Sequence, residues 1–107
     1  MKQREDAEGG ARARDGLARV LAALDGPDAV DAFLDDLCTP AEIEAMADRW
    51  SVVPLLAQGL SYRQIHDETG VSVTTVGRIA RCLDAGAGGY RAALEHHHEH
   101  PAALPTV

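Results

Sequence analysis

The segment from Ser61 to Leu83 is rich in small hydroxylated side chains and arginines, interleaved with aliphatic residues. Hydroxyl groups donate and accept hydrogen bonds, and short side chains let a partner surface approach closely. A guanidinium group pairs with a guanine edge or a phosphate, and a threonine methyl group fits against the methyl group of thymine. These residue types predict contacts with the base edges and phosphates of double-stranded DNA. The side chains expected on the outer face are Ser72, Thr74, Thr75, Arg78 and Arg81.

Two short helices joined by a tight turn would position this face. Ser61 with Gln64 three residues later forms a capping box, which predicts the start of the first helix. Gly70 takes the turn position that requires a positive φ, and Ser72 caps the second helix. This pattern predicts a helix-turn-helix at residues 61–83, whose second helix enters the major groove. An ordinary pair of helices joined by a glycine turn is the alternative.

The net charge of −7 is unusual for a protein that binds nucleic acid, so the distribution of the charge matters. Eight carboxylates and no lysine or arginine lie between Asp25 and Asp48. Between Ser61 and Leu83, three arginines exceed two carboxylates. Because binding strength depends on how many phosphates are neutralised, so few arginines predict modest affinity unless two subunits bind together.

The hydrophobic spacing predicts further helices outside this segment. They cover about residues 17–24, 30–37, 40–58 and 90–100. Pro27 and Pro40 suit first helical positions, and Thr39 is the expected cap of the third of these helices. Pro54 removes one backbone donor inside the third helix, so we expect a kink or a split there.

We therefore expect an all-α fold, a small helical bundle in a single domain. Residues 11–100 are expected to form this domain, between flexible tails at residues 1–10 and 101–107. Hydrophobic residues make up 46% of the chain but aromatic residues only 4%, so the core is expected to be mostly aliphatic, with Trp50 packed in it or at an interface. Short chains with such cores often complete them by dimerising.

The sequence carries no membrane or secretion signal that we recognise. No apolar run approaches the roughly 20 residues that span a bilayer, and the N-terminus lacks the apolar region of a secretory signal. Cys38 and Cys82 lack any metal-type spacing, so reduced thiols are expected. We expect a cytoplasmic protein with no membrane partner.

Several stretches together resemble the YerC/YecD branch of the Trp repressor superfamily. They are residues 36–50, 59–65, 68–78 and 81–83, with Gly89-Tyr90. The resemblance covers about residues 24–94. It implies an all-helical, intertwined homodimer that regulates transcription by binding operator DNA through paired recognition helices.

The resemblance also implies a ligand pocket beside the recognition helix. The family positions that hold tryptophan correspond to Thr39, Arg49, Thr75 and Arg78. However, Ile79 stands where the family has the glycine that makes room for the indole ring, and Cys82 stands at a nearby serine position. We therefore expect no response to tryptophan, with the pocket closed or serving another, unknown effector. Arg49 and Arg78 would then pair with Asp48 or Asp84, or contact phosphate.

For DNA contact, the family pattern carries over to one residue before the turn and several after it. These are Arg63, Val73, Thr74, Thr75 and Gly77. Together with the outer face and Gln64, the predicted DNA-binding set is Arg63, Gln64, Ser72, Val73, Thr74, Thr75, Gly77, Arg78 and Arg81. A glycine inside a helix costs about 1 kcal/mol relative to alanine. Gly77 thus indicates either that DNA approaches the helix closely at this position or that the helix merely tolerates a glycine there.

Two histidine features have ordinary interpretations. His96, His97, His98 and His100 lie near the C-terminus without the fixed further ligands of a metal site, so we expect no functional metal. His66, followed by two carboxylates, is interpreted as part of a solvated helix face.

No catalytic motif, phosphate-binding loop or nucleophile with a base partner is present, so we expect neither an enzyme nor a cofactor. The alternative to a regulator is a helical dimeric module that binds a protein partner and has little affinity for DNA.

Overall fold

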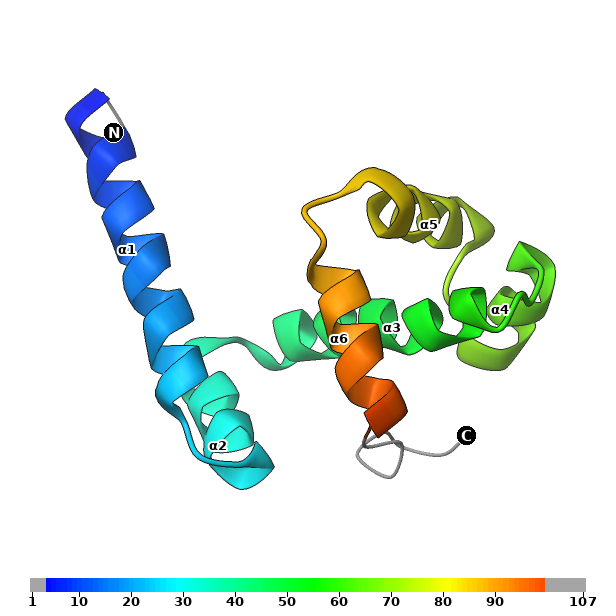
Figure 1. Ribbon diagram of the computed structural model, residues 1–107, viewed down its shortest axis with the longest axis horizontal. Coiled ribbons are helices and arrows are strands. Elements are labelled where there is room, and N and C mark those ends of the chain that lie inside the picture. The colour runs from blue at the N-terminus through cyan, green and yellow to red at the C-terminus, as the bar shows by residue number, and fades with distance from the viewer. Residues whose placement is uncertain (1–3, 100–107) are drawn as a thin grey trace. The chain divides into compact units, whose positions relative to one another are not determined.

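The computed structural model describes the backbone of residues 4–99 and the side chains of residues 7–97. This part of the chain forms six α-helices and no strand, so the expectation of an all-α fold is confirmed (Figure 1). The chain divides into two compact units, Met1–Pro40 and Ala41–Val107. The residues predicted to form a C-terminal tail lie outside the described part.

The first unit consists of α1 (Arg4–Ala23) and α2 (Pro27–Leu37). Gly26, at a φ of 96°, turns the chain between them, and Pro27 begins α2 because its fixed φ already suits a helix. α1 begins inside the segment predicted to be a flexible tail. Residues 7–14 explain the difference, since alanine, glutamate and arginine are good helix formers and outnumber the two glycines.

The first unit buries little of its apolar surface. None of its described residues is buried, and α2 contributes no buried side chain. Leu17, Val20 and Leu37 are 37%, 44% and 52% exposed. Burial of apolar surface is the main stabilising contribution in folding, so these two helices have no complete core of their own.

The second unit contains α3 (Pro40–Ala57), α4 (Tyr62–Thr69), α5 (Val73–Ala85) and α6 (Gly89–Glu99). Pro54 lies inside α3 and is buried, and its carbonyl accepts a hydrogen bond from the Gln58 N–H at 3.0 Å. The helix continues through Pro54 to Ala57, so the expected alternative of a split helix is wrong.

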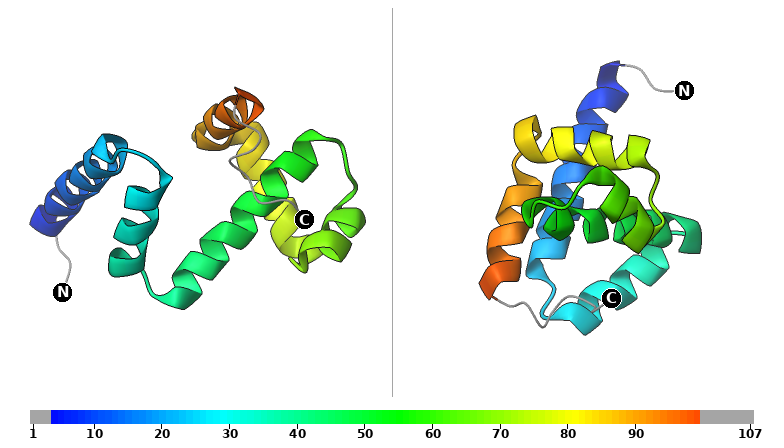
Figure 2. Two further views of the ribbon diagram at one scale, coloured as in Figure 1. Left: turned by 90° about the horizontal axis from the view of Figure 1, so that it is seen from below. Right: turned by 90° about the vertical axis from the view of Figure 1, so that its right-hand side faces the viewer.

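The hydrophobic core of the second unit joins all four of its helices, whose arrangement is drawn in Figure 2. Its fully buried side chains are Val52, Val53, Ile65 and Val76. Val71, Ile79 and Leu94 complete the cluster, and Trp50 packs against it, as its place on the apolar stripe predicted. This aliphatic core fixes α4 and α5 on the end of α3.

Within residues 4–99, none of the helices is both long and apolar enough to cross a lipid bilayer.

Candidate nucleic-acid interface

The start of α4 is fixed by a complete capping box. The Ser61 hydroxyl accepts a hydrogen bond from the Gln64 N–H at 3.1 Å, and Gln64 Oε1 accepts one from the Ser61 N–H at 2.8 Å. Two backbone donors that the helix itself leaves unpaired are thereby satisfied. The predicted start of the first helix is confirmed, and the Gln64 side chain is engaged in it.

The turn between α4 and α5 is built from one glycine and one threonine. Gly70 ends α4 in the left-handed region, at φ 79° and ψ −4°, and its N–H donates to the His66 carbonyl at 2.8 Å. The Thr69 hydroxyl donates to the Ile65 carbonyl at 2.8 Å and accepts from the Val71 N–H at 3.1 Å. Val71 is buried in the core directly after the glycine. The predicted glycine turn is therefore confirmed.

His66 makes a contact that the sequence analysis missed. Its Nδ1 atom lies 2.8 Å from the carbonyl oxygen of Val71, so the imidazole connects the last turn of α4 to the loop before α5. The side chain is exposed, as expected for a solvated helix face, but it is also held in a fixed direction. No local pattern in the sequence indicated this contact, because it depends on how the turn folds back against α4.

The first turn of α5 is organised by Ser72. Its hydroxyl accepts a hydrogen bond from the Thr75 N–H at 3.2 Å and lies 3.0 Å from the Thr75 hydroxyl, to which it donates. The second predicted cap is confirmed. Val73 and Thr74, between these two residues, are exposed at the start of the helix.

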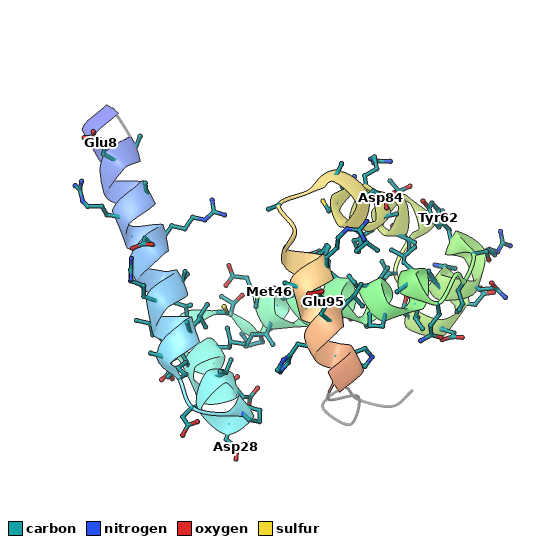
Figure 3. All side chains as sticks on the ribbon, in the orientation of Figure 1. Glu8, Asp28, Met46, Tyr62, Asp84 and Glu95 are labelled. Carbon is teal, nitrogen blue, oxygen red and sulfur yellow. The ribbon has the colours of Figure 1, made fainter. Side chains whose placement is uncertain are left out.

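Most residues of the predicted DNA-binding set lie on the surface of α4 and α5. The exposed members are Arg63, Gln64, Ser72, Val73, Thr74, Arg78 and Arg81, and Thr75 is half-buried. Gly77 differs because it is buried, and a Cβ atom at its position would lie 3.5 Å from the Tyr62 ring. Tyr62 begins α4 beside α5 (Figure 3). Gly77 therefore packs between the helices, and we leave it out of the DNA-facing residues.

A surface hollow of about 430 Å³ separates the exposed side of α4 from the start of α5. Arg63, His66 and Asp67 line it from α4, and Ser72 and Val73 line it from the start of α5. Three of these five residues belong to the predicted DNA-binding set. We call this feature the α4–α5 hollow.

A second and larger pocket, of about 530 Å³, lies beside α5 and is called the α5 pocket. Arg49 lines it from α3 and Tyr90 from α6, and the α5 residues that line it include Thr75, Arg78, Ile79 and Cys82. The structure thus brings together five of the six residues predicted to form a ligand pocket. Ile79 is 3% exposed, yet the pocket stays open beside it.

The sixth predicted pocket residue, Thr39, belongs to the first unit, whereas the α5 pocket is lined by the second unit alone. Asp48 lines the pocket next to Arg49. Asp84, one of the carboxylates considered as a partner for Arg78, instead lies 3.7 Å from the Arg91 guanidinium.

Within the described residues, no group of three or more histidine, cysteine, aspartate or glutamate side chains is placed to hold a metal ion. The histidine-rich run lies on α6 as far as its end at Glu99, and His100 is outside the described part.

Comparison with known proteins identifies relatives in sequence and in fold. A family model described as Trp repressor protein matches residues 14–98. YerC of Bacillus subtilis (strain 168), a protein described as uncharacterized, is 44% identical over 63 residues, which span 59% of this chain and 61% of YerC.

Solved structures also match the fold. A TrpR-like protein from Eubacterium eligens ATCC 27750 aligns with a TM-score of 0.75 and 30% identity, over 79% of this chain and 88% of that one. A Trp repressor candidate from Staphylococcus aureus aligns with a TM-score of 0.74 and 32% identity, over 90% and 94% of the two chains.

Proposed function

The chain belongs to the Trp repressor family, and from this premise we propose that it is a transcriptional regulator that reads operator DNA as a homodimer. The observation that carries the proposal is the arrangement of α4 and α5. Their aliphatic sides are fixed in the core, while the start of α5 and the arginines of both helices remain on the surface. A helix presented in this way fits the major groove with its N-terminal side chains toward the base edges.

Six residues of the DNA-facing set have a task that suits their chemistry. Ser72, Val73 and Thr74, at the start of α5, are short enough to lie against base edges and thymine methyl groups. Arg63 on α4 pairs with a phosphate or a guanine edge next to them. Arg78 and Arg81, farther along α5, add positive charge toward the backbone.

The proposed homodimer is supported by the first unit. The apolar side chains of α1 and α2 that one chain leaves exposed, including Leu17, Val20 and Leu37, would be covered by a second copy. Two copies also double the number of arginines on the DNA, which compensates for the small positive excess of one helix-turn-helix. The paired α5 helices should lie about 34 Å apart, one turn of DNA.

Binding of DNA can be tested by fluorescence anisotropy with duplexes enriched by the protein itself, over a series of salt concentrations. The wild type should bind with an affinity that falls steeply with salt, because phosphates are neutralised. Arg63→Ala and Thr75→Ala should each weaken binding about tenfold, whereas Arg19→Ala, on the exposed side of α1, should bind like the wild type. Absence of binding by the folded wild type at low salt would refute the proposal.

We further propose that tryptophan does not control this regulator. Ile79 forms a wall of the α5 pocket where the family has glycine, and its branched side chain takes the space that an indole ring would need. The pocket nevertheless remains open between Arg49 and Arg78, so it suits a small anionic effector of another shape. Added tryptophan should leave the melting temperature unchanged, and a concentration-dependent rise would refute this part of the proposal.

The second candidate function is a helical dimer that binds a protein partner and has little affinity for DNA. The net charge of −7 and the acidic run from Asp25 to Asp48 favour it. The same anisotropy series separates the two functions, because this candidate predicts a folded dimer that fails to bind any duplex at low salt.

A further inference from the structure

The contact between His66 and Val71 determines which ring nitrogen of His66 can change its charge. A carbonyl oxygen only accepts hydrogen bonds, so Nδ1, 2.8 Å from the Val71 oxygen, must carry a proton. The other nitrogen, Nε2, then gains or loses the proton when the imidazole titrates. In the neutral ring, Nε2 presents a lone pair, and in the charged ring it presents an N–H donor.

Because Nδ1 is engaged in this hydrogen bond, the Nε2 edge of the ring remains available at the surface. His66 lines the α4–α5 hollow together with Arg63, Ser72 and Val73, three residues proposed to face DNA. Nδ1 is turned toward the backbone of the turn, so the edge available to a molecule that enters the hollow is the one with Nε2. When the ring is charged, an anion in the hollow would find two cationic side chains on one helix, one turn apart.

We propose that His66 binds a backbone phosphate of operator DNA through Nε2, and only when the ring is protonated. This inference rests on the proposed function, because it concerns the same surface. A neutral ring would set its Nε2 lone pair against a phosphate oxygen, which is also an acceptor, whereas the charged ring donates a charge-assisted hydrogen bond. DNA binding is therefore coupled to uptake of one proton by each subunit.

The charged side chains that line the hollow together with His66 both lie on α4. On α4, Arg63 and Asp67 line the hollow with it, and the turn and α5 contribute only the uncharged Ser72 and Val73. Arg63 and the charged His66 ring would both interact with a phosphate that enters the hollow. Because only the charged ring donates a hydrogen bond to the phosphate, the affinity for DNA should rise as the pH falls.

The test measures the affinity of the full chain for one enriched duplex at about pH 6 and about pH 8, at constant ionic strength. The wild-type dimer should bind about a hundredfold more tightly at the lower pH, because a hydrogen bond to a charged group contributes about tenfold in each of the two subunits. Its salt dependence should also be steeper at the lower pH, by about one phosphate contact in each subunit.

Two variants and one control make the test specific. His66→Gln should bind at both pH values as the wild type does at the higher pH, and His66→Lys should bind tightly at both. His96→Gln, a histidine change on α6, should keep the wild-type pH dependence.

DNA binding that does not change with pH in the wild type would overturn the inference and leave the proposed function intact. Equal pH dependence in wild type and His66→Gln would do the same. Absence of binding by every variant would overturn the proposed function and this inference with it.

Discussion

At the residue scale, two glycines in the same motif have opposite roles. Gly70 is in the left-handed region at φ 79°, whereas Gly77 is inside α5 with a helical backbone. A side chain at Gly70 would strain the backbone even though the space around it is open. A Cβ at Gly77 would make only ordinary contacts, 3.5 Å from Tyr62 and 3.9 Å from Arg81.

Gly70→Ala should therefore lower the free energy of unfolding by about 1 kcal/mol, the cost of a left-handed conformation for a residue with a Cβ atom. Gly77→Ala is the matched control and should leave stability unchanged or raise it by up to about 1 kcal/mol, because alanine is the better helix former. Urea denaturation followed by circular dichroism measures both. A destabilised Gly77→Ala would contradict this account, because it would show that a Cβ atom at Gly77 does not fit against the Tyr62 ring.

At the element scale, the two helices of the motif are held by short-range contacts at their ends. Ser61→Ala should cost about 1 kcal/mol of unfolding free energy, because it disrupts the capping box with Gln64. Ser51→Ala also removes a serine hydroxyl, but one that bonds only to the Asp48 carbonyl inside α3, so it serves as the control. Equal stability of the two variants would show that the box contributes nothing.

The junction between α5 and α6 depends on Gly86. A Cβ atom there would lie 2.4 Å from the Cys82 carbonyl oxygen, a backbone atom that cannot move without disturbing the end of α5. Gly86→Ala should lower the melting temperature by several degrees, which corresponds to about 1–2 kcal/mol for a chain of this length. Gly89→Ala, with nothing within 4 Å, is the control and should have little effect. Equal melting temperatures for the two variants would contradict the close contact at Gly86.

The elements and caps could be predicted because their signals are local. Ser61, Gly70 and Ser72 act on atoms no more than four residues away, so the sequence alone places the turn. The packing of Gly77 on Tyr62 and the hydrogen bond of His66 could not be predicted, because they depend on how α4 meets α5. The helix at residues 4–10 escapes prediction because its polar composition is equally typical of a tail.

At the scale of the whole molecule, the exposed apolar side chains of the first unit suggest that two chains are needed. Val20→Asp and Leu37→Asp should convert the dimer to a monomer, because each places a charge in the surface that the second copy covers. Ala22 lies on the side of α1 opposite to Val20 by helical spacing. The Ala22→Asp variant adds the same charge there, and the protein should remain a dimer. Light scattering after size exclusion gives the mass. A monomeric wild type would contradict the proposed homodimer.

The most direct test of DNA reading is a selection of bound sequences from random duplexes by the folded full chain. A dimer with two α5 helices in successive major grooves should enrich an inverted repeat, with half-sites centred about 10 base pairs apart. Arg63→Ala should enrich it more weakly. If the folded wild type enriches no sequence at low salt, the helix-turn-helix at residues 61–83 is not a DNA-reading module in this protein.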